Sequence, residues 1–182
     1  SKNGTVKEAL RLGCSAVGFT IYPGSDHQYE MIEEFKEISL EAAEYGLPSV
    51  LWSYPRGPEI SKKAETSIDT ISYAAHIAAL LGAHIIKVKP PASSVSESSL
   101  EENYNVIINL NSLSERVKHI KKCAFNSKRI VVFSGGNAKG DEEILTEIKQ
   151  IKDGGGNGSI IGRNSFQRPK EQALDLLKKI IE

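Results

Sequence analysis

The sequence predicts an α/β fold built on a parallel β-sheet, and two observations carry this prediction. In each of four segments, the end of a helix is followed by a glycine and then by an apolar strand with a polar end. Five apolar strands begin near residues 16, 49, 84, 130 and 159, so successive strands start 29 to 46 residues apart. These spacings leave room for a crossover helix between neighbouring strands, as a parallel sheet requires.

The first three strands each follow a helix that ends in glycine. They lie in "SAVGFTIYP", "PSVLWSYPRG" and "AHIIKVKPP", and the helix before the first strand has a capping box of Thr5 and Glu8. The fourth and fifth strands lie in "RIVVFSGG" and "GSIIGRN". The glycines expected in the left-handed conformation that ends many helices are Gly13, Gly46, Gly82 and Gly154.

Two later helices are indicated by apolar residues at helical spacing. The first helix, between the fourth and fifth strands, carries the stripe Ile144, Leu145, Ile148 and Ile151. The second begins after Pro169 and carries the stripe Leu174, Leu177 and Ile181. Residues 90–105, "PPASSVSESSLEENYN", interrupt the regular order and are expected to form an exposed and mobile polar loop.

Five such units fit either an open doubly wound sheet or part of a (β/α)8 barrel, which takes about 250 residues. No linker or change of composition marks a domain boundary, so residues 1–182 are expected to form a single domain. The chain starts with Ser and opens on a helix that no strand precedes. Up to three further units are therefore expected before residue 1.

The composition is that of an ordinary globular domain and limits the kinds of partner. The chain has 182 residues, of which 40% are hydrophobic and 25% are charged, and its formal net charge is zero. This balance gives no reason to expect nucleic acid or an anionic membrane as a partner. No apolar run approaches the ~18 residues of a membrane span. Cys14 and Cys123 lack metal-binding spacing and are expected to be buried, reduced thiols in the cytoplasm.

Both architectures gather function at the carboxyl ends of their strands. The fourth strand ends in "SGG" and the fifth in "GRN". In barrels, the loops after the last two strands commonly bind phosphate through backbone N–H groups. Ordinary tight turns could also account for the glycines in "SGG" and "GRN". Because the two segments follow consecutive final strands, a phosphate site is favoured. Its expected members are Ser134, Gly135, Gly136, Gly162 and Arg163.

The third strand places two lysines on one face, because side chains alternate along a strand. Snorkelling of a long side chain to the rim suits Lys89, next to Pro90, better than Lys87. Burial among Ile and Val, with a second ammonium group nearby, lowers the pKa of an amine. A neutral amine attacks carbonyl carbons, which is the basis of Schiff-base catalysis. Lys87 is therefore the expected nucleophile, and Lys89 is expected to tune it or to contact a ligand anion.

Several segments resemble the archaeal-type (DhnA-type) class I fructose-bisphosphate aldolases. The similar segments are "SAVGFTIYPGS", "LWSYPRG", "GAHIIKVK", "VVFSGG" and "IIGRNSFQR", and the resemblance is weakest over residues 90–128. Members of this family are TIM barrels that cleave fructose 1,6-bisphosphate into dihydroxyacetone phosphate and glyceraldehyde 3-phosphate through a lysine imine. The resemblance implies that the five strands here are the last five of such a barrel.

The resemblance also implies roles for individual residues. Lys87 matches the Schiff-base lysine, Tyr54 the acid/base tyrosine and Trp52 the tryptophan that lines the pocket, although core packing is the ordinary interpretation of such an aromatic pair. The positions that match the binding site of the C1 phosphate are Gly135, Gly136, Gly162 and Arg163. The family implies no metal, no cofactor and a cytoplasmic homo-oligomer whose partner is a small sugar phosphate.

The family also uses an Asp in a D-H-G motif on its first barrel strand, and this chain does not contain that segment. Asp26-His27 follows a different strand and is expected to be a surface turn. Two other functions therefore stay open beside the aldolase. One is a related lysine-dependent aldolase or transaldolase-like synthase with another donor. The other is a degenerate barrel that binds sugar phosphates without chemistry.

Overall fold

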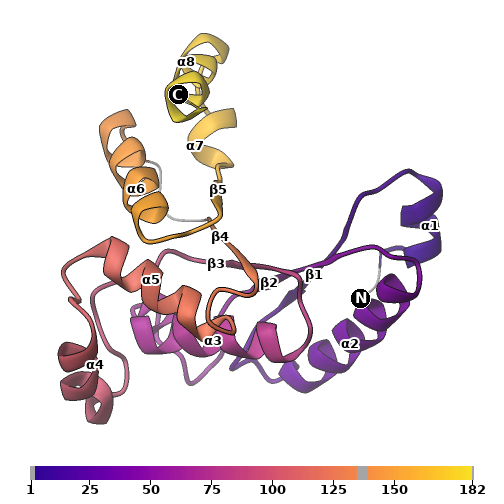
Figure 1. Ribbon diagram of the computed structural model, residues 1–182, viewed down its shortest axis with the longest axis horizontal. Coiled ribbons are helices and arrows are strands. Elements are labelled where there is room, and N and C mark those ends of the chain that lie inside the picture. The colour runs from indigo at the N-terminus through magenta and orange to yellow at the C-terminus, as the bar shows by residue number, and fades with distance from the viewer. Residues whose placement is uncertain (1–2, 135–138, 182) are drawn as a thin grey trace.

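The computed structural model describes residues 3–134 and 139–181, in which five parallel strands form one sheet (Figure 1). The strands are β1 (Val17–Ile21), β2 (Ser49–Ser53), β3 (Ile85–Val88), β4 (Ile130–Ser134) and β5 (Gly158–Ile160). They pair in chain order, so β1 and β5 are the two edges of the sheet. The predicted parallel sheet is therefore confirmed, with each strand starting within one residue of its expected position.

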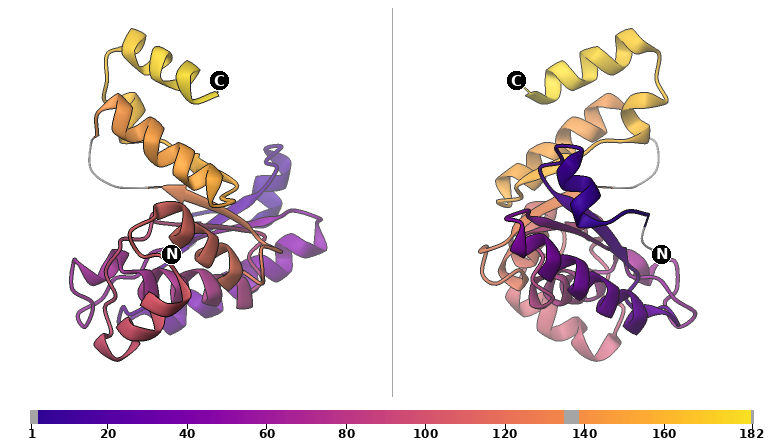
Figure 2. Two further views of the ribbon diagram at one scale, coloured as in Figure 1. Left: turned by 60° about the vertical axis from the view of Figure 1, so that its left-hand side comes forward. Right: turned by 90° about the vertical axis from the view of Figure 1, so that its right-hand side faces the viewer.

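Helices occupy the connections between the strands, as the spacing predicted. They are α1 (Val6–Arg11), α2 (Gln28–Glu44), η1 (Ala64–Thr66), α3 (Ile68–Leu80), η2 (Ser98–Leu100), α4 (Glu101–Ile107), α5 (Leu113–Cys123), α6 (Asp141–Asp153), α7 (Arg163–Phe166) and α8 (Lys170–Ile181). Figure 1 shows α2, α3 and α5 along one side of the sheet, with α6, α7 and α8 gathered beside β5. Figure 2 shows the same division from two further directions. Within the described ranges, no helix combines the length and the apolar character that a membrane span needs.

One face of the sheet packs against these helices and forms the core. The strand residues on this face that are almost completely buried are Ile21, Leu51, Ile86, Val88, Val131 and Phe133. The helix residues that join them in the same core include Phe35, Ile68, Ile71, Val117 and Ile120. Burial of these side chains is the main favourable contribution to folding, and it fixes the sheet against its helices.

The opposite face of the sheet carries the polar and aromatic residues. Strand pairing places one residue from each strand in a single row, which consists of Thr20, Trp52, Lys87, Val132 and Gly158. Side chains two residues further along each strand point from the same face, nearer the carboxyl ends. These include Tyr54, Lys89 and Ser134. The candidate residues on the central strands therefore occupy two adjacent rows of one face.

The expected helix ends are confirmed at three glycines and wrong at the fourth. Gly13, Gly46 and Gly82 have φ angles of 73°, 69° and 89°. Gly154 has a φ of −78°, and the next residue, Gly155, takes the left-handed conformation with a φ of 79°. The helix α6 thus continues one residue further than the sequence suggested before the chain turns.

Residues 90–105 differ from the expected mobile loop in two respects. Helix α4 begins at Glu101 inside this segment. The carboxylate of Asp69, in the first turn of α3, accepts hydrogen bonds from the backbone N–H groups of Ser96 and Glu97, each at 2.9 Å. The segment is therefore anchored to α3, by a contact between residues too far apart in sequence to be recognised from composition.

Two expectations about burial are also wrong. Cys14 is exposed and Cys123 is only partly buried, although both are free thiols. In α8, Leu174 is 56% exposed and Ile181 is 85% exposed, whereas Leu176 is completely buried. The apolar stripe assigned from helical spacing is thus not the side of α8 that packs in this structure.

Candidate active site

Lys87 lies at the centre of the sheet face, in the third of the five strands. Its residue surface is only 8% exposed. Its Nζ atom lies 5.2 Å from the centre of the Trp52 ring system and 5.8 Å from the centre of the Tyr54 ring. This follows from the pairing of Trp52 with Lys87 across β2 and β3. Trp52 and Tyr54, which the sequence placed on one face of their strand, thus lie next to the amine of Lys87 on the neighbouring strand.

Burial lowers the pKa of Lys87. A larger share of this amine is therefore uncharged at a given pH than for a lysine in water, because the low-dielectric surroundings disfavour the ammonium form. An uncharged amine is the form that attacks carbonyl carbons. The predicted contribution of desolvation is confirmed, whereas Lys89 is not the cause of the shift.

Tyr54 follows β2 directly, and its side chain makes a hydrogen bond with the side chain of Ser134 at the end of β4. Since β3 lies between β2 and β4, this contact passes over the strand that carries Lys87. Burial raises the pKa of Tyr54, the nearby Tyr22 adds to the increase, and the Ser134 hydrogen bond opposes it. The phenol therefore keeps its proton over the physiological range and is able to donate it.

The loops after β1 and β2 lock together and fix the direction in which Tyr54 and Arg56 leave the sheet. The N–H of Tyr54 donates to the carbonyl of Ile21 at 3.1 Å, and the N–H of Arg56 donates to that of Pro23 at 3.0 Å. A Cβ atom on Gly57 would lie 1.6 Å from a backbone oxygen of the other loop. The glycine in "WSYPRG" is thus required by the close approach of two backbones.

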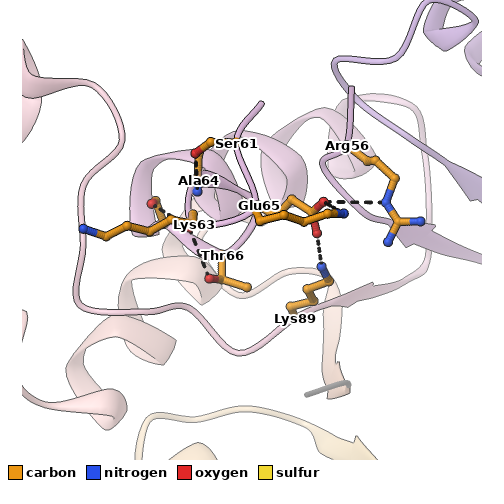
Figure 3. Close-up of polar contacts among 9 residues, drawn as sticks. Arg56, Ser61, Lys63, Ala64, Glu65, Thr66 and Lys89 are labelled. Atoms are coloured by element: carbon orange, nitrogen blue, oxygen red, sulfur yellow. Dashed lines mark hydrogen bonds and ion pairs between the residues drawn. The ribbon is translucent and has the colours of Figure 1, made fainter. Parts of the chain in front are cut away.

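Lys89 is held by a carboxylate that sequence reasoning missed. Its Nζ lies 2.7 Å from Oε2 of Glu65, whose other oxygen, Oε1, lies 3.7 Å from Arg56 Nε (Figure 3). The same Oε1 lies 2.7 Å from Lys62 Nζ. Only the pair of Lys62 and Glu65, three residues apart, could have been suggested by the sequence. Arg56 and Lys89 reach Glu65 only through the fold. A contact between Lys89 and a ligand anion stays a prediction.

Three of the five expected phosphate residues line a cavity at the carboxyl ends of β4 and β5. Ser134, Gly162 and Arg163 line one cavity of about 250 Å³. Gly162 directly precedes α7, and Arg163 is the first residue of that helix. Gly135 and Gly136 lie outside the described residues. The structure thus brings three of the five predicted residues to one cavity.

Arg168, which was not singled out from the sequence, ties the start of α6 to α7. Its Nε donates to the carbonyl of Asn164 at 2.6 Å, and its Nη2 donates to the carbonyl of Lys139 at 2.9 Å. It also pairs with Asp141 at the start of α6. The side chain of Asn164 in turn accepts from the N–H of Lys139 at 2.9 Å. The start of α6 and helix α7 are therefore fixed to each other.

A metal centre was not expected here. Over residues 3–134 and 139–181, no group of three or more His, Cys, Asp and Glu side chains is arranged to hold a metal ion.

Comparison with known proteins gives relatives with a common chemistry. A curated relative from Halobacterium salinarum, named fructose-bisphosphate aldolase class 1, is 37% identical over 180 residues, which cover 98% of this chain and 59% of the relative. A relative from Methanocaldococcus jannaschii is named fructose-bisphosphate aldolase/6-deoxy-5-ketofructose 1-phosphate synthase. It is 34% identical over 176 residues, which cover 96% of this chain and 50% of the relative.

A solved structure supports the same relationship. It is an archaeal fructose-1,6-bisphosphate aldolase whose catalytic Lys is described as covalently bound to the carbinolamine intermediate of its substrate. It matches with a TM-score of 0.79 and 32% identity, covering 99% of this chain and 63% of that chain. The five-stranded sheet therefore has the TIM-barrel-like fold of that enzyme, and the chain spans less than two thirds of the length of these relatives. A family model for DeoC/LacD family aldolases matches residues 2–168, and the chain belongs to that family.

Proposed function

We propose that the protein acts as a class I aldolase that reversibly cleaves fructose 1,6-bisphosphate into dihydroxyacetone phosphate and glyceraldehyde 3-phosphate. The observation that carries this proposal is the buried amine of Lys87, with its lowered pKa, beside the rings of Trp52 and Tyr54. The names of the two curated relatives and of the solved structure support the same reaction.

In the proposed reaction, the Lys87 nitrogen attacks the keto carbon of the sugar, and one of its protons moves to the former carbonyl oxygen to give a carbinolamine. A second proton, supplied by a general acid, then allows this oxygen to leave as water. Loss of water leaves a protonated imine, which accepts the electron pair released when the neighbouring carbon–carbon bond breaks. The Tyr54 phenol is positioned to exchange protons during these steps, which typically contributes 10²–10⁴-fold in rate. Trp52 forms the wall of the pocket next to the amine.

The C1 phosphate is proposed to bind at the ends of β4 and β5. Ser134, Gly162 and Arg163 line the cavity there, and Gly135 and Gly136 belong to the same proposed site. A fixed phosphate would hold the keto carbon near the amine, so that binding energy is used for orientation. Lys89 is proposed as a further substrate contact. A sugar phosphate is the proposed partner, and a cytoplasmic homo-oligomer is the proposed form.

Reductive trapping tests the proposal. Sodium borohydride added with dihydroxyacetone phosphate should leave a stable adduct on Lys87, found by peptide mass mapping. The variant Lys87→Ala should lose both the adduct and the cleavage of fructose 1,6-bisphosphate. Lys118→Ala, which removes an exposed lysine of α5, is the matched control and should keep both. Cleavage that survives in Lys87→Ala would refute the proposed nucleophile.

The name of the Methanocaldococcus relative favours a second candidate, a related aldolase with another substrate. Cleavage assays with fructose 1,6-bisphosphate and with 6-deoxy-5-ketofructose 1-phosphate separate the two. The proposed aldolase cleaves the bisphosphate, and an enzyme that ignores it but forms the Lys87 adduct belongs to the second class. Binding of sugar phosphates without any adduct would identify a barrel without chemistry.

A further inference from the structure

Two primary amines stand two residues apart on one strand face, yet only one of them can form the imine with a given substrate. Lys87 and Lys89 carry the same functional group and lie in adjacent rows of the sheet face. Burial lowers the pKa of Lys87, which has the aromatic rings of Trp52 and Tyr54 beside it. Lys89 differs because a carboxylate holds it. The fold thus distinguishes the two amines by their partners.

The carboxylate of Glu65 comes from η1, in the connection between β2 and α3. The residue is 5% exposed, which is rare for an ionised side chain. Its Oε2 accepts a hydrogen bond from Lys89 Nζ at 2.7 Å (Figure 3). Its Oε1 accepts one from Lys62 Nζ at the same distance. Burial alone would raise the pKa of Glu65. The hydrogen bonds and charges of Lys62 and Lys89 outweigh that effect and lower the pKa to about 2.

The carboxylate is therefore charged throughout the pH range in which an aldolase would act, and a nearly buried charge requires its partner. The side chain of Lys89 is 21% exposed, so its ammonium group is partly removed from water as well. Charge-assisted hydrogen bonds of this length are about twice as strong as neutral ones. Lys89 is thus held in place by the carboxylate with little access to water, whereas the side chain of Lys62 is 84% exposed.

We propose that Glu65 is a positioning residue that directs imine formation to Lys87 by holding the amino group of Lys89 in an ion pair. The inference rests on the proposed aldolase function. Imine formation needs a nitrogen lone pair to form the bond to the keto carbon, after which the carbonyl oxygen takes up protons and leaves as water. In the ion pair, the Lys89 nitrogen is held at the Glu65 carboxylate at 2.7 Å and not at the keto carbon. Lys89 therefore does not compete with Lys87 while the pair with Glu65 is intact.

The test maps borohydride adducts formed with dihydroxyacetone phosphate in four proteins. In the wild-type protein the adduct should lie on Lys87. Glu65→Gln keeps the shape of the side chain but removes its charge, so the share of adduct on Lys89 should rise at least about tenfold, given the strength of hydrogen bonds to charged groups. Lys62→Gln removes the other close partner of the same carboxylate and should leave the distribution as in the wild type.

Lys87→Ala tests whether Lys89 forms an adduct while its ion pair with Glu65 is intact. With Glu65 present, this variant should form no adduct on Lys89, and the double variant Lys87→Ala/Glu65→Gln should gain one. Labelling of Lys89 in Lys87→Ala alone at the wild-type yield would overturn the inference. So would an adduct confined to Lys87 in Glu65→Gln, although the proposed aldolase function would then stand. A wild-type protein without any adduct would refute that function and this inference together.

Discussion

The indole of Trp52 on β2 lies against the backbone of Gly18 on β1, so closely that a Cβ atom at residue 18 would lie 2.7 Å from its Cζ3 atom. On the next strand, Lys87 Nζ lies 5.2 Å from the centre of the same ring system. The ring therefore contacts a position without a side chain on β1 and lies close to the candidate nucleophile on β3. This makes Gly18 a determinant of the pocket although it bears no functional group.

Gly18→Ala should displace the indole and weaken catalysis. Contacts under 3 Å force the ring or the strand to shift, and overpacking of this kind typically costs about 1–3 kcal/mol in unfolding free energy. A displacement of about 1 Å near the reacting groups lowers rates by up to about 100-fold. We expect kcat/KM for fructose 1,6-bisphosphate to fall within that range, as measured by steady-state kinetics.

Gly140→Ala is the matched control for this substitution. A Cβ atom at Gly140 would have no neighbour within 4 Å, so the change from Gly to Ala should leave kcat/KM and the unfolding midpoint nearly as they are. If Gly18→Ala and Gly140→Ala behave alike, the packing of Gly18 against Trp52 has no role in the site.

The pH dependence of kcat/KM should show two limbs. Burial lowers the pKa of Lys87 below its ordinary value of 10.5, so its neutral form appears as the pH rises through that lowered pKa, and the rate rises with it. Burial raises the pKa of Tyr54 above 10.0, so the phenol loses its proton only at higher pH, where the rate falls. A rate profile over the stable pH range measures both limbs. A rising limb at the ordinary lysine value would contradict the buried amine.

Tyr54→Phe separates proton transfer from adduct formation. The ring and its packing remain, but the hydroxyl is lost, so cleavage should fall by about 10²–10⁴-fold. The falling alkaline limb should disappear, while borohydride trapping on Lys87 persists. Ser134→Ala removes the hydrogen bond that lowers the pKa of Tyr54, and it should move this limb to higher pH. Tyr73→Phe, which removes the hydroxyl of an exposed tyrosine of α3, is the control and should leave both cleavage and the alkaline limb as in the wild type.

The strands, their order along the chain and the candidate residues that they carry could be predicted because they depend on local patterns. The apolar runs, the glycine before four of the five strands and the period of two residues placed Trp52 and Tyr54 on one face, and Lys87 on the neighbouring strand. The sequence also indicated the cavity at the last two strand ends, which Ser134 and Arg163 line. Each of these inferences needed only residues close together in the chain.

The contacts that organise the site could not be predicted, since they join residues distant in sequence. Glu65 and Lys89 are 24 residues apart and meet only because η1 lies over the end of β3. The space for the Trp52 indole exists because β1 pairs with β2 in a particular register. The helix α4 was missed because a segment rich in Ser and Glu has the composition of an exposed loop. The hydrogen bonds that anchor the preceding residues come from the distant Asp69, which composition cannot reveal.

Arg168→Ala should weaken binding of the phosphorylated substrate without removing the nucleophile. The guanidinium group bonds the carbonyls of Asn164 and Lys139, and its side chain is only 18% exposed, so no solvent can replace it fully. Each lost hydrogen bond of a charged group costs about 1.5–3 kcal/mol when its partner stays buried. We expect KM for fructose 1,6-bisphosphate to rise at least about tenfold, with kcat reduced much less, because one lost bond of that strength corresponds to such a change in affinity. Lys170→Ala, an exposed residue at the start of α8, should change neither. If Arg168→Ala lowers kcat and leaves KM unchanged, the two loops do not hold the phosphate.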